Sequence, residues 1–571
     1  MAYKKFWSFS RNPWKRGLIR VTQSVNNMIS LSGIRKQYGQ KVLYENGNFQ
    51  IRPGDKIGLV GPNGAGKTTI FRLITGEEGP DGGSISKPER WVVGYFSQDV
   101  GEMKGRSALA EVMAGAGRVS LLGAELEKMQ ERLGRLETDP MDDDAMTELL
   151  ERYGEAQSEF ETRGGFDLDT RAKEILTGLG IGPGDYDLPV ESFSGGWKMR
   201  IELAKILALK PDVLLMDEPT NQLDLESIVW LEQWLAEYKG ALLMTSHDRD
   251  FLNRLVTRIV AVENKSITVF SGNYDFYERE RAIRVEQLMA AVQKQQDMLA
   301  KENEFISRFA ARASHAAQVQ SRVKMLEKIE RIEIPAEERA VNFDFPVAPR
   351  GGNDVVKIAG LGKRYQREDG TEKLVFENAS AMVGRLERIA VVGVNGAGKS
   401  TMLKIIAGQV AASLGEAKVG ASVHVGYFSQ HALDLLDPKM TVFEEMHQRV
   451  PESTIGYIRN LLGAFLFSGD DVHKKISVLS GGEKSRVVLA TILSSPVNLL
   501  ILDEPTNHLD IKSREMLLDA LKKFQGTILL VSHDRHFLRE VATRVFELDR
   551  GELRIYPGTY EYYLDQKAQG R

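Results

Sequence analysis

Short apolar runs mark buried strands in two distant parts of the chain. Two of these runs end in paired carboxylates: residues 213–218 read VLLMDE and residues 499–504 read LLILDE. Two others, residues 56–60 and 389–392, lead directly into glycine-rich segments. A continuous apolar run of this length, bounded by turn-forming residues, is typical of a strand that is covered on both faces of a parallel sheet. The pattern therefore predicts an α/β fold that is built twice.

The same motifs recur along the chain at fixed offsets. The segment that begins at Gly61 returns at Gly393, which is 332 residues later. From Ser194 onward the offset between the copies is only 286 residues. The first copy therefore contains about 46 additional residues between Gln98 and Ser194.

These additional residues have a helical pattern over about residues 118–163. Apolar residues recur there at helical spacing, first at Leu122, Leu126, Met129, Leu133 and Leu136, and then at Met146, Leu149, Leu150, Tyr153 and Phe160. A Thr-Asp-Pro sequence at residues 138–140 interrupts the pattern, so we expect two helices in a hairpin, called the arm below. The tip of the arm is acidic, which favours either a basic protein surface or simple exposure to solvent.

A second helical segment, residues 273–354, joins the two copies and is called the linker below. Its ends mix acidic and basic residues, but residues 305–326 contain no Asp or Glu. Four cations lie in this acid-free window, namely Arg308, Arg312, Arg322 and Lys324. Two antiparallel helices with a basic tip fit this pattern, and such a tip favours the phosphates of a nucleic acid. A solvated linker without a partner is the alternative interpretation.

Both copies contain the Gly-x-x-x-x-Gly-Lys-Ser/Thr pattern directly after an apolar run. Its glycines allow successive backbone N–H groups to converge on phosphate oxygens, while the lysine reaches the outer phosphates. The predicted nucleotide-binding residues are Gly61, Pro62, Asn63, Gly64, Ala65, Gly66, Lys67, Thr68 and Thr69, and in the second copy Gly393, Val394, Asn395, Gly396, Ala397, Gly398, Lys399, Ser400 and Thr401.

The carboxylates at the ends of the long apolar runs complete two sites for ATP hydrolysis. The predicted Mg²⁺ ligands are Thr68, Ser400, Asp217 and Asp503. The next residue in each copy lies where a base must activate the attacking water, which assigns this role to Glu218 and Glu504. An imidazole that reaches the γ-phosphate is predicted at His247 and His533, each after a further apolar run.

Composition excludes several classes of protein and several kinds of site. The 571 residues carry 75 Lys and Arg against 79 Asp and Glu, so a uniformly basic nucleic-acid binder is excluded but a local basic patch is not. Cysteine is absent, which excludes disulfides, zinc ribbons and iron–sulfur clusters and suits a reducing cytoplasm. No apolar run reaches 18 residues, so we expect no membrane insertion. Residues 1–27 are basic and lack an apolar core. We therefore expect either an extension outside the fold or a basic N-terminal segment that contacts RNA.

Taken together, these motifs resemble ATP-binding cassette domains. The resemblance covers nearly the whole chain from Met28 and implies two tandem cassettes, residues 28–272 and 355–571, that close head to tail over two ATP molecules within one monomer. Each ATP would also contact the signature sequence of the opposite cassette, at Ser194, Gly195 and Gly196 or at Ser480, Gly481 and Gly482. The resemblance further implies adenine stacking on Tyr38 and Tyr365, and roles in Mg²⁺ binding and catalysis for Gln98 and Gln430.

Two departures from the cassette pattern distinguish the copies. The residue after the signature glycines is Trp197 in one copy and Glu483 in the other, instead of the usual Gln. Ahead of the Leu-Asp pair that follows each carboxylate run, Gln222 stands where the second copy has His508. These differences predict unequal hydrolysis rates at the two ATP sites.

The tandem arrangement and the linker resemble the ABC-F group of ribosome-associated ATPases. The sequences FISRF at residues 305–309 and QVQSR at residues 318–322 are similar to that group's tRNA-facing linker motif. The resemblance implies a cytoplasmic translation factor that binds near the ribosomal exit site, with the linker tip close to peptidyl-tRNA and the peptidyl-transferase centre. Regulation of translation, relief of stalling and antibiotic protection remain open as its role. The alternatives are the ATPase subunit of a transporter and a DNA-repair-linked ATPase.

Overall fold

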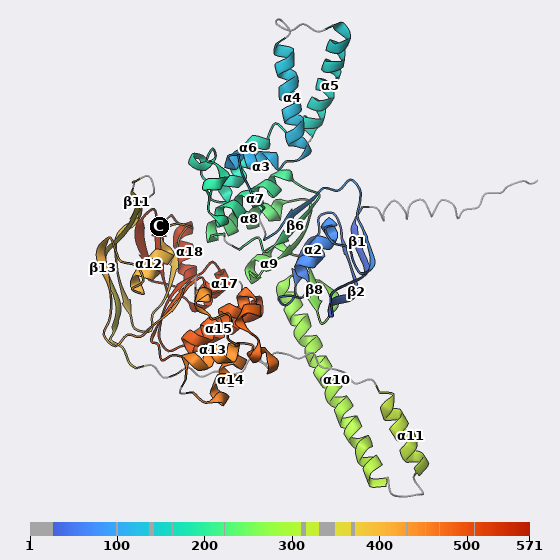
Figure 1. Ribbon diagram of the computed structural model, residues 1–571, viewed down its shortest axis with the longest axis vertical. Coiled ribbons are helices and arrows are strands. Elements are labelled where there is room, and N and C mark those ends of the chain that lie inside the picture. Colours follow the sequence, from blue (N-terminus) through green and yellow to red (C-terminus); the bar gives the residue numbers. More distant parts are fainter. Residues whose placement is uncertain are drawn as a thin grey trace, which may run out of the picture.

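The computed structural model describes residues 27–570, apart from residues 99–100, 136–141, 163, 222, 310–315, 330–345, 347–348, 367–369, 371, 430–431, 452, 468 and 508. Residues 1–26 of the predicted basic extension lie outside this range, as do Arg312 and Gln430. Two α/β cassettes lie next to each other, and two helical hairpins project from opposite ends of the molecule (Figure 1). The predicted fold, two tandem P-loop cassettes with a helical arm and a helical linker, is confirmed.

Cassette 1 runs from β1 to β9 and contains two sheets over the described residues. A six-stranded sheet has the order β5-β6-β7-β3-β8-β9, in which the first five strands are parallel and β9 is antiparallel to β8. Its strands are β3 (Lys56–Val60), β5 (Val93–Phe96), β6 (Val213–Asp217), β7 (Ala241–Thr245), β8 (Arg258–Glu263) and β9 (Ser266–Ser271). A smaller antiparallel sheet consists of β2 (Lys41–Ile51), β1 (Ile29–Tyr38) and β4 (Gly82–Ser86).

Cassette 2 runs from β10 to α18 and repeats this plan in the described part of the chain. Its six-stranded sheet has the order β14-β15-β16-β12-β17-β18. These strands are β12 (Arg388–Val392), β14 (Val425–Phe428), β15 (Leu499–Asp503), β16 (Thr527–Val531), β17 (Arg544–Asp549) and β18 (Glu552–Tyr556). The smaller antiparallel sheet consists of β11 (Glu372–Gly384), β10 (Asp354–Gln366) and β13 (Leu414–Val419).

Helices cover the large sheets and bring the ends of parallel strands to one edge. In cassette 1 they are α2 (Lys67–Thr75), α3 (Ala108–Ala114), α6 (Leu168–Gly178), α7 (Gly195–Leu209), α8 (Leu225–Glu237) and α9 (Arg249–Leu255). In cassette 2 they are α12 (Lys399–Ile406), α13 (Val442–Arg449), α14 (Ile455–Ala464), α15 (Gly481–Leu493), α16 (Ile511–Lys523), α17 (Arg535–Val541) and α18 (Tyr560–Ala568). Short 3₁₀ turns connect them at Pro183–Asp185, Val190–Ser192, Ala432–Leu435, Gly469–His473 and Ile476–Val478.

Each large sheet is buried on both faces, as the continuous apolar runs predict. Successive residues of β6 alternate between two cores: Leu214 and Met216 pack with α7, while Val213 and Leu215 pack with α2 and the smaller sheet. The strand β15 divides its residues between two cores of cassette 2 in the same way. Because both faces of the sheet are covered, polar residues can reach a ligand only at the edge where the carboxyl ends of the strands meet. The candidate sites lie at that edge.

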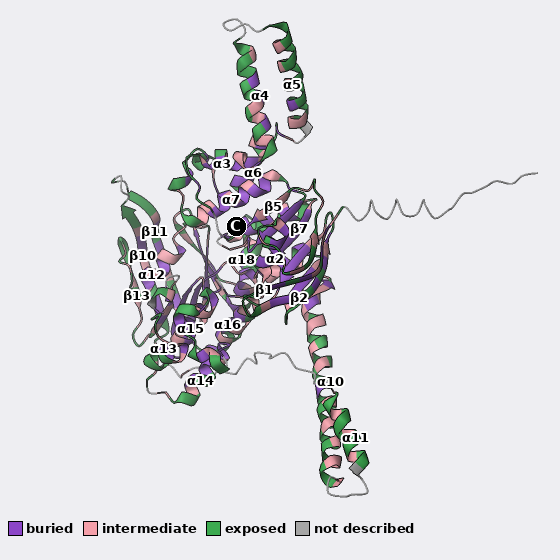
Figure 2. Cartoon of the chain, turned by 45° about the vertical axis from the view of Figure 1, so that its right-hand side comes forward, coloured by how far each residue is buried: buried purple, intermediate pink, exposed green. Residues whose placement is uncertain are grey.

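The arm consists of α4 (Arg118–Gly134) and α5 (Asp143–Thr162), and most of it is exposed (Figure 2). Its small core contains Leu122, Leu126 and Met129, with Tyr153 and Phe160 packed against it. Leu150, which we expected in the apolar stripe, is half-exposed. One residue along a helix is a rotation of about 100°, so Leu149 and Leu150 cannot both face the partner helix. The predicted break at residues 138–140 lies outside the described residues.

The linker begins with α10 (Tyr274–Phe309), a 36-residue helix, and returns along α11 (Ala316–Glu327). At 1.5 Å per residue, α10 extends about 54 Å. It starts at the end of β9 in cassette 1 and projects away from both cassettes (Figure 1). In the described ranges, no helix is both long enough and apolar enough to cross a membrane.

Candidate nucleotide sites between the cassettes

The two predicted phosphate loops lie between an inner strand and a helix in each cassette. The first joins β3 to α2, and the second joins β12 to α12. Gly61 has a φ of 151°, and a Cβ there would lie 2.3 Å from the carbonyl oxygen of Val262. Gly393 repeats this arrangement, with a φ of 143° and the carbonyl oxygen of Leu548 at 2.2 Å. Only glycine fits this tight turn, which leaves the loop backbone open toward an anion.

A lysine follows each loop at the first position of the helix. Lys67 Nζ donates to the carbonyl oxygen of Gly61 at 2.8 Å, and Lys399 Nζ donates to that of Gly393 at 2.7 Å. Burial lowers the pKa of both lysines, while nearby carboxylates oppose this shift. A buried ammonium at a loop of backbone N–H groups is an arrangement that favours a phosphate chain.

The predicted Mg²⁺ ligands form one hydroxyl–carboxylate pair in each cassette. The Thr68 hydroxyl donates to Asp217 Oδ2 at 2.6 Å, and the Ser400 hydroxyl donates to Asp503 Oδ1 at 2.9 Å. Among the described residues, no cluster of three or more His, Asp or Glu side chains is arranged to hold a metal. A hydroxyl and a carboxylate beside a phosphate loop fit Mg²⁺ that would be bound through these two groups, phosphate oxygens and water, which is its usual mode in nucleotide sites.

A glutamate and a histidine lie side by side at each site. The Nε2 atom of His247 is 3.4 Å from Glu218 Oε1, and that of His533 is 3.2 Å from Glu504 Oε1. Both glutamates are in the left-handed backbone region, with φ of 54° for Glu218 and 51° for Glu504. Such a conformation is strained for a residue with a side chain, and it is found most often at functional positions.

Burial shifts the pKa values of these groups in opposite directions. It raises the pKa of Glu218 and of Glu504 to about 7 in each case, although the nearby lysine opposes the shift. It lowers the pKa of His247 and of His533 to about 3 in each case. Each pair is thus a neutral imidazole beside a carboxyl group whose pKa is close to neutral pH, which suits a group that must accept a proton from water.

Residues from both cassettes enclose the first site, called site 1 below. One cavity of about 470 Å³ brings together the phosphate loop, Tyr38, Gln98, Asp217, Glu218 and His247 of cassette 1 with Ser480, Gly481 and Gly482 of cassette 2. The structure thus places the signature sequence of cassette 2 opposite the phosphate loop of cassette 1. Tyr38 is about half-exposed at this cavity, and Lys36 Nζ lies over its ring, 5.2 Å from the ring centroid.

The second site, called site 2 below, pairs the phosphate loop of cassette 2 with cassette 1. The backbone N–H of Asn395 donates to Asp224 Oδ2 across the interface at 3.2 Å. Asp224 is buried and is also bound by Arg200 of α7 at 3.1 Å. Tyr365 of cassette 2 is exposed to a similar extent as Tyr38 of cassette 1. Ser194, at the start of α7, makes no side-chain capping bond to its helix.

The two signature sequences make different local contacts. In cassette 2, the Ser480 hydroxyl donates to Glu483 Oε2 at 2.7 Å and accepts the Glu483 N–H, so this serine is part of a capping box. In cassette 1, the Trp197 ring instead covers the Arg200 guanidinium at 4.6 Å. The two ATP sites therefore receive different signature residues from the opposite cassette.

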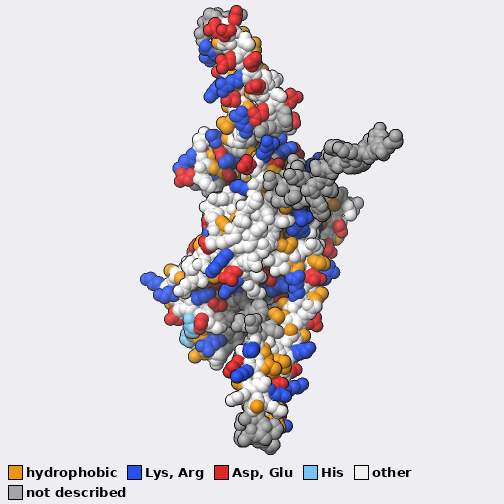
Figure 3. All heavy atoms as spheres, turned by 90° about the vertical axis from the view of Figure 1, so that its right-hand side faces the viewer, with side chains coloured by type: hydrophobic (Ala, Val, Ile, Leu, Met, Phe, Trp, Pro, Cys, Tyr) orange, Lys and Arg blue, Asp and Glu red, His pale blue; other side chains and the backbone are white. Residues whose placement is uncertain are grey.

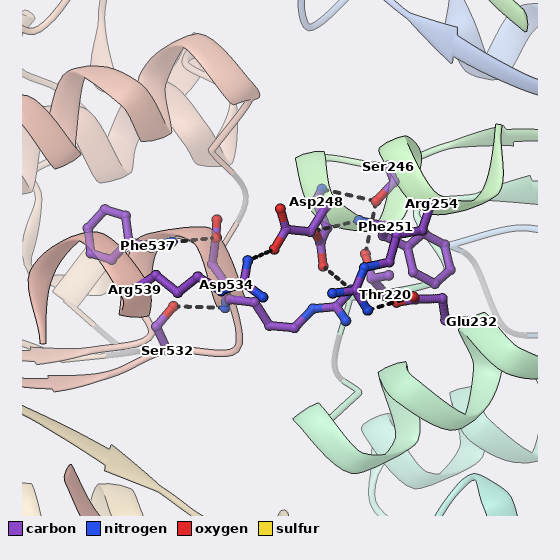
Figure 4. A network of polar contacts seen from close by, with 12 residues as sticks. Thr220, Glu232, Ser246, Asp248, Phe251, Arg254, Ser532, Asp534, Phe537 and Arg539 are labelled. Atoms are coloured by element: carbon purple, nitrogen blue, oxygen red, sulfur yellow. Dashed lines mark hydrogen bonds and ion pairs between the residues drawn. The ribbon is translucent and has the colours of Figure 1, made fainter. Parts of the chain in front are cut away.

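Further ion pairs join the cassettes beside the sites. Arg535 Nη2 of cassette 2 lies 2.8 Å from Glu232 Oε2 and 3.6 Å from Asp248 Oδ2, both of cassette 1. Arg539 pairs with Asp250 in the same region. Figure 4 shows Glu232, Asp248 and Arg254 of cassette 1 facing Ser532, Asp534 and Phe537 of cassette 2.

Several residues at the sites were not predicted from the sequence. Lys41 and Leu43 line the cavity of site 1. Asp224, which the sequence marked only as part of the Leu-Asp pair, bonds to the phosphate loop of site 2, and Arg200 bonds to Asp224. Arg200 could have been found from the repeat, because Arg486 is the same residue type 286 positions later. Lys41 and Leu43 lie in a strand without a motif, so only the folded arrangement identifies them.

The raised pKa values of the glutamates lead to a prediction about stability. A carboxyl group with a folded pKa near 7 and an unfolded pKa near 4.5 holds its proton more tightly when folded, so the free energy of unfolding should fall as pH rises between these values. Glu218→Gln with Glu504→Gln removes this penalty. We expect the double variant to melt at least a few degrees above the parent protein at pH 8, and at nearly the same temperature at pH 5. Nucleotide-free differential scanning calorimetry measures this, and an equal shift at both pH values would contradict it.

Comparison with known proteins identifies the family of the chain. A family model described as ABC transporter matches residues 44–221 and again residues 376–507, and a second model of the same description matches residues 260–345. The chain is 37% identical to the probable ATP-binding protein YheS of Haemophilus influenzae over 94% of this chain and 81% of that protein. It is 36% identical to ABC transporter F family member 5 of Arabidopsis thaliana over 96% of this chain and 78% of that protein.

The chain belongs to the ABC transporter F family. Among solved structures, it is similar to an archaeal ribosome recycling factor, aABCE1, determined in complex with a ribosomal stalk protein. That likeness has a TM-score of 0.58 and 19% identity, and it covers 94% of this chain and 92% of the other, so it shows a common fold. As a member of this family, the protein is an ATPase, with ATP as its substrate and Mg²⁺ as its cofactor.

Proposed function

We propose that this ATPase is a cytoplasmic translation factor that acts on the ribosome as a monomer. In this proposal, it binds near the exit site, and its linker acts on the geometry of peptidyl-tRNA and the peptidyl-transferase centre. Membership of the ABC transporter F family supports the class of protein, and the linker supports the partner. The observation that carries the proposal is the long linker, which has cations at its far end and its root at the interface between the two cassettes.

One arginine at the root of the linker contacts both the first turns of α10 and cassette 2. Arg249 lies two residues after His247 at the start of α9. Its Nη2 atom lies 2.8 Å from Asp275 Oδ1 and 2.8 Å from Glu278 Oε2, both in the first turns of α10. Its Nη1 atom lies 3.6 Å from Glu515 Oε1 of cassette 2. A change in the distance between the cassettes would therefore act directly on the base of the linker.

The four cations of the tip are not equally available to a partner. Arg308 pairs with Glu304 at 2.7 Å, although both side chains are about two-thirds exposed. Arg322 pairs with Glu302 at 2.5 Å and lies over the Phe305 ring at 3.9 Å. Lys324 lies on α11, and Arg312 is outside the described residues. We infer that Lys324 and Arg308 contribute more to RNA binding than Arg322, which already has both an acidic and an aromatic partner.

The two projections differ in charge. Figure 3 shows Asp and Glu side chains mixed with Lys and Arg along both the arm at the top and the linker at the bottom, so the difference lies in the residues at the two ends. The arm begins its second helix with Asp143 and Asp144. We propose that the linker contacts RNA, while the arm contacts a basic protein surface, because acidic side chains repel bare phosphate.

The linker proposal predicts weaker ribosome binding on charge reversal. Replacing Arg308, Arg312, Arg322 and Lys324 with Glu should weaken binding at least about a hundredfold, because each phosphate that the linker no longer binds keeps its counterions. Co-sedimentation with ribosomes in the presence of ATP measures the affinity. The slope of log K against log salt should also become shallower, by about 0.7 to 0.9 for each phosphate that is no longer bound.

Two lysines of the smaller sheet in cassette 2 provide the matched control. Lys357→Glu with Lys373→Glu changes charge at exposed positions of β10 and β11, outside the two linker helices, and should leave ribosome binding unchanged. ATP binding should be unaffected in both variants. If the linker variant pellets with ribosomes as well as the unmodified protein does, the linker has no role in binding RNA. If the unmodified protein does not co-sediment at all, the transporter and DNA-repair alternatives regain support.

A further inference from the structure

A threonine at the end of β7 forms hydrogen bonds with residues of the predicted metal site in cassette 1. Thr245 is fully buried and has two polar partners in site 1. Its hydroxyl donates to Asp217 Oδ1 at 2.7 Å and accepts the backbone N–H of Glu218 at 2.9 Å. One side chain thus binds both the predicted metal ligand and the backbone of the predicted base.

The corresponding position in cassette 2 has no hydroxyl. Asp217 pairs with Thr245 between β6 and β7, and Asp503 pairs with Val531 between β15 and β16 in the same register. The two positions are separated by the 286-residue repeat offset. In cassette 2, the backbone N–H of Glu504 donates instead to the carbonyl oxygen of Val531 at 2.9 Å. The two glutamates keep nearly the same φ, so the cassettes differ here in one side chain and in the acceptor of the glutamate N–H.

We propose that Thr245 is a positioning residue for Mg²⁺ at site 1 and that the two ATP sites therefore bind Mg²⁺ with different affinities. This inference rests on the proposed role of Asp217 as a metal ligand. A hydroxyl that donates to Oδ1 restricts rotation of the carboxylate and keeps Oδ2, which faces Thr68, directed toward the metal position. At site 2 the residue opposite Asp503 is Val531, whose side chain cannot donate the corresponding hydrogen bond.

The size of the expected effect follows from the behaviour of supporting hydrogen bonds at metal sites. Loss of a group that orients a metal ligand usually lowers metal affinity by about 10- to 100-fold. Thr245→Val removes the hydroxyl and keeps the branched shape, so the sheet should fold as before. It also leaves the N–H of Glu218 without its hydroxyl partner, which should speed amide exchange there. Thr245→Ser keeps the hydroxyl and should preserve both properties.

The experiment measures Mg²⁺-dependent binding of a fluorescent ATP analogue at one site at a time. Lys399→Ala restricts binding to site 1, and Lys67→Ala restricts it to site 2. In the Lys399→Ala background, we expect Thr245→Val to raise the half-saturating Mg²⁺ concentration about tenfold, and Thr245→Ser to restore it. In the Lys67→Ala background, Thr245→Val should change it little. Thr527→Val is the matched control, since Thr527 is an equally buried threonine at the first position of β16, the strand of cassette 2 that corresponds to β7.

A second measurement does not depend on ATP or metal. Hydrogen–deuterium exchange of the nucleotide-free protein should show faster exchange for the peptide that contains Glu218 in Thr245→Val, but not in Thr245→Ser or Thr527→Val. Equal Mg²⁺ dependence of Thr245→Val and the parent at site 1 would overturn the proposal, as would an equal shift at both sites. Asp217→Asn tests the metal ligand separately from Thr245. If it leaves the Mg²⁺ dependence of site 1 unchanged, the assignment of Asp217 as ligand is wrong.

Discussion

Replacing Glu218 and Glu504 together with glutamine should slow ATP hydrolysis at least about a hundredfold while ATP binding is retained. Glutamine keeps the shape of the side chain but cannot accept the proton of the attacking water. The phosphate-loop lysines and the Asp–hydroxyl pairs remain in place, so nucleotide and metal should still bind. Steady-state phosphate release and equilibrium binding of a fluorescent ATP analogue measure the two quantities. Glu89→Gln with Glu552→Gln, two exposed glutamates, is the control and should hydrolyse ATP normally.

The same variant tests the link between ATP and the proposed partner. If hydrolysis opens the cassettes, the glutamine variant should stay closed, with the Arg249 junction holding the linker in its ribosome-bound position. Added to a reconstituted translation reaction with ATP, it should stop peptide synthesis and pellet with ribosomes. Normal synthesis and no retention on ribosomes would contradict the translation-factor proposal but leave the ATPase assignment intact. Rapid hydrolysis by the variant would instead show that the two glutamates are not the bases.

Replacing Lys67 and Lys399 together with alanine should weaken ATP binding by about two orders of magnitude or more. Each lysine follows its phosphate loop with Nζ bonded to a loop carbonyl oxygen, and removing a largely desolvated charge partner of this kind costs about 2–5 kcal/mol. Hydrolysis should disappear together with binding, in contrast to the glutamine variant. Isothermal titration calorimetry with Mg²⁺-ATP measures the affinity. Undiminished ATPase activity would show that the two phosphate loops are not the binding sites.

The alanine variant needs a control for the removal of two positive charges. Lys239→Ala with Lys357→Ala removes two exposed lysines, one from each cassette, and should bind ATP with the affinity of the unmodified protein. Single variants add a further comparison. Because site 1 and site 2 differ at Thr245 and Val531, Lys67→Ala and Lys399→Ala should not be equivalent: each leaves one site, and the two remaining sites should require different Mg²⁺ concentrations.

Local sequence determined the fold class, the repeat and most of the chemistry. Two continuous apolar runs predicted the buried strands β6 and β15 because a strand covered on both faces has no polar side. The phosphate loops could be identified from sequence because their function needs glycines at fixed positions beside a lysine. The arm and the linker were visible as helical periodicity, which depends only on residues three and four positions apart. The ABC-F resemblance arose from these same local motifs.

Only the tertiary structure decided how the two halves combine. The bond from Asn395 to Asp224 joins positions 171 residues apart, and the contact of Arg249 with Glu515 joins positions even farther apart, so no local pattern contains them. The partners of the tip cations also came from the fold, since Glu302 and Glu304 lie just outside the acid-free window and reach back into it. Thr245 looked like an ordinary strand residue until pairing of β6 with β7 placed its hydroxyl against Asp217. Sequence specifies which groups are present, whereas distance and direction between groups on separate strands depend on how the sheet is assembled.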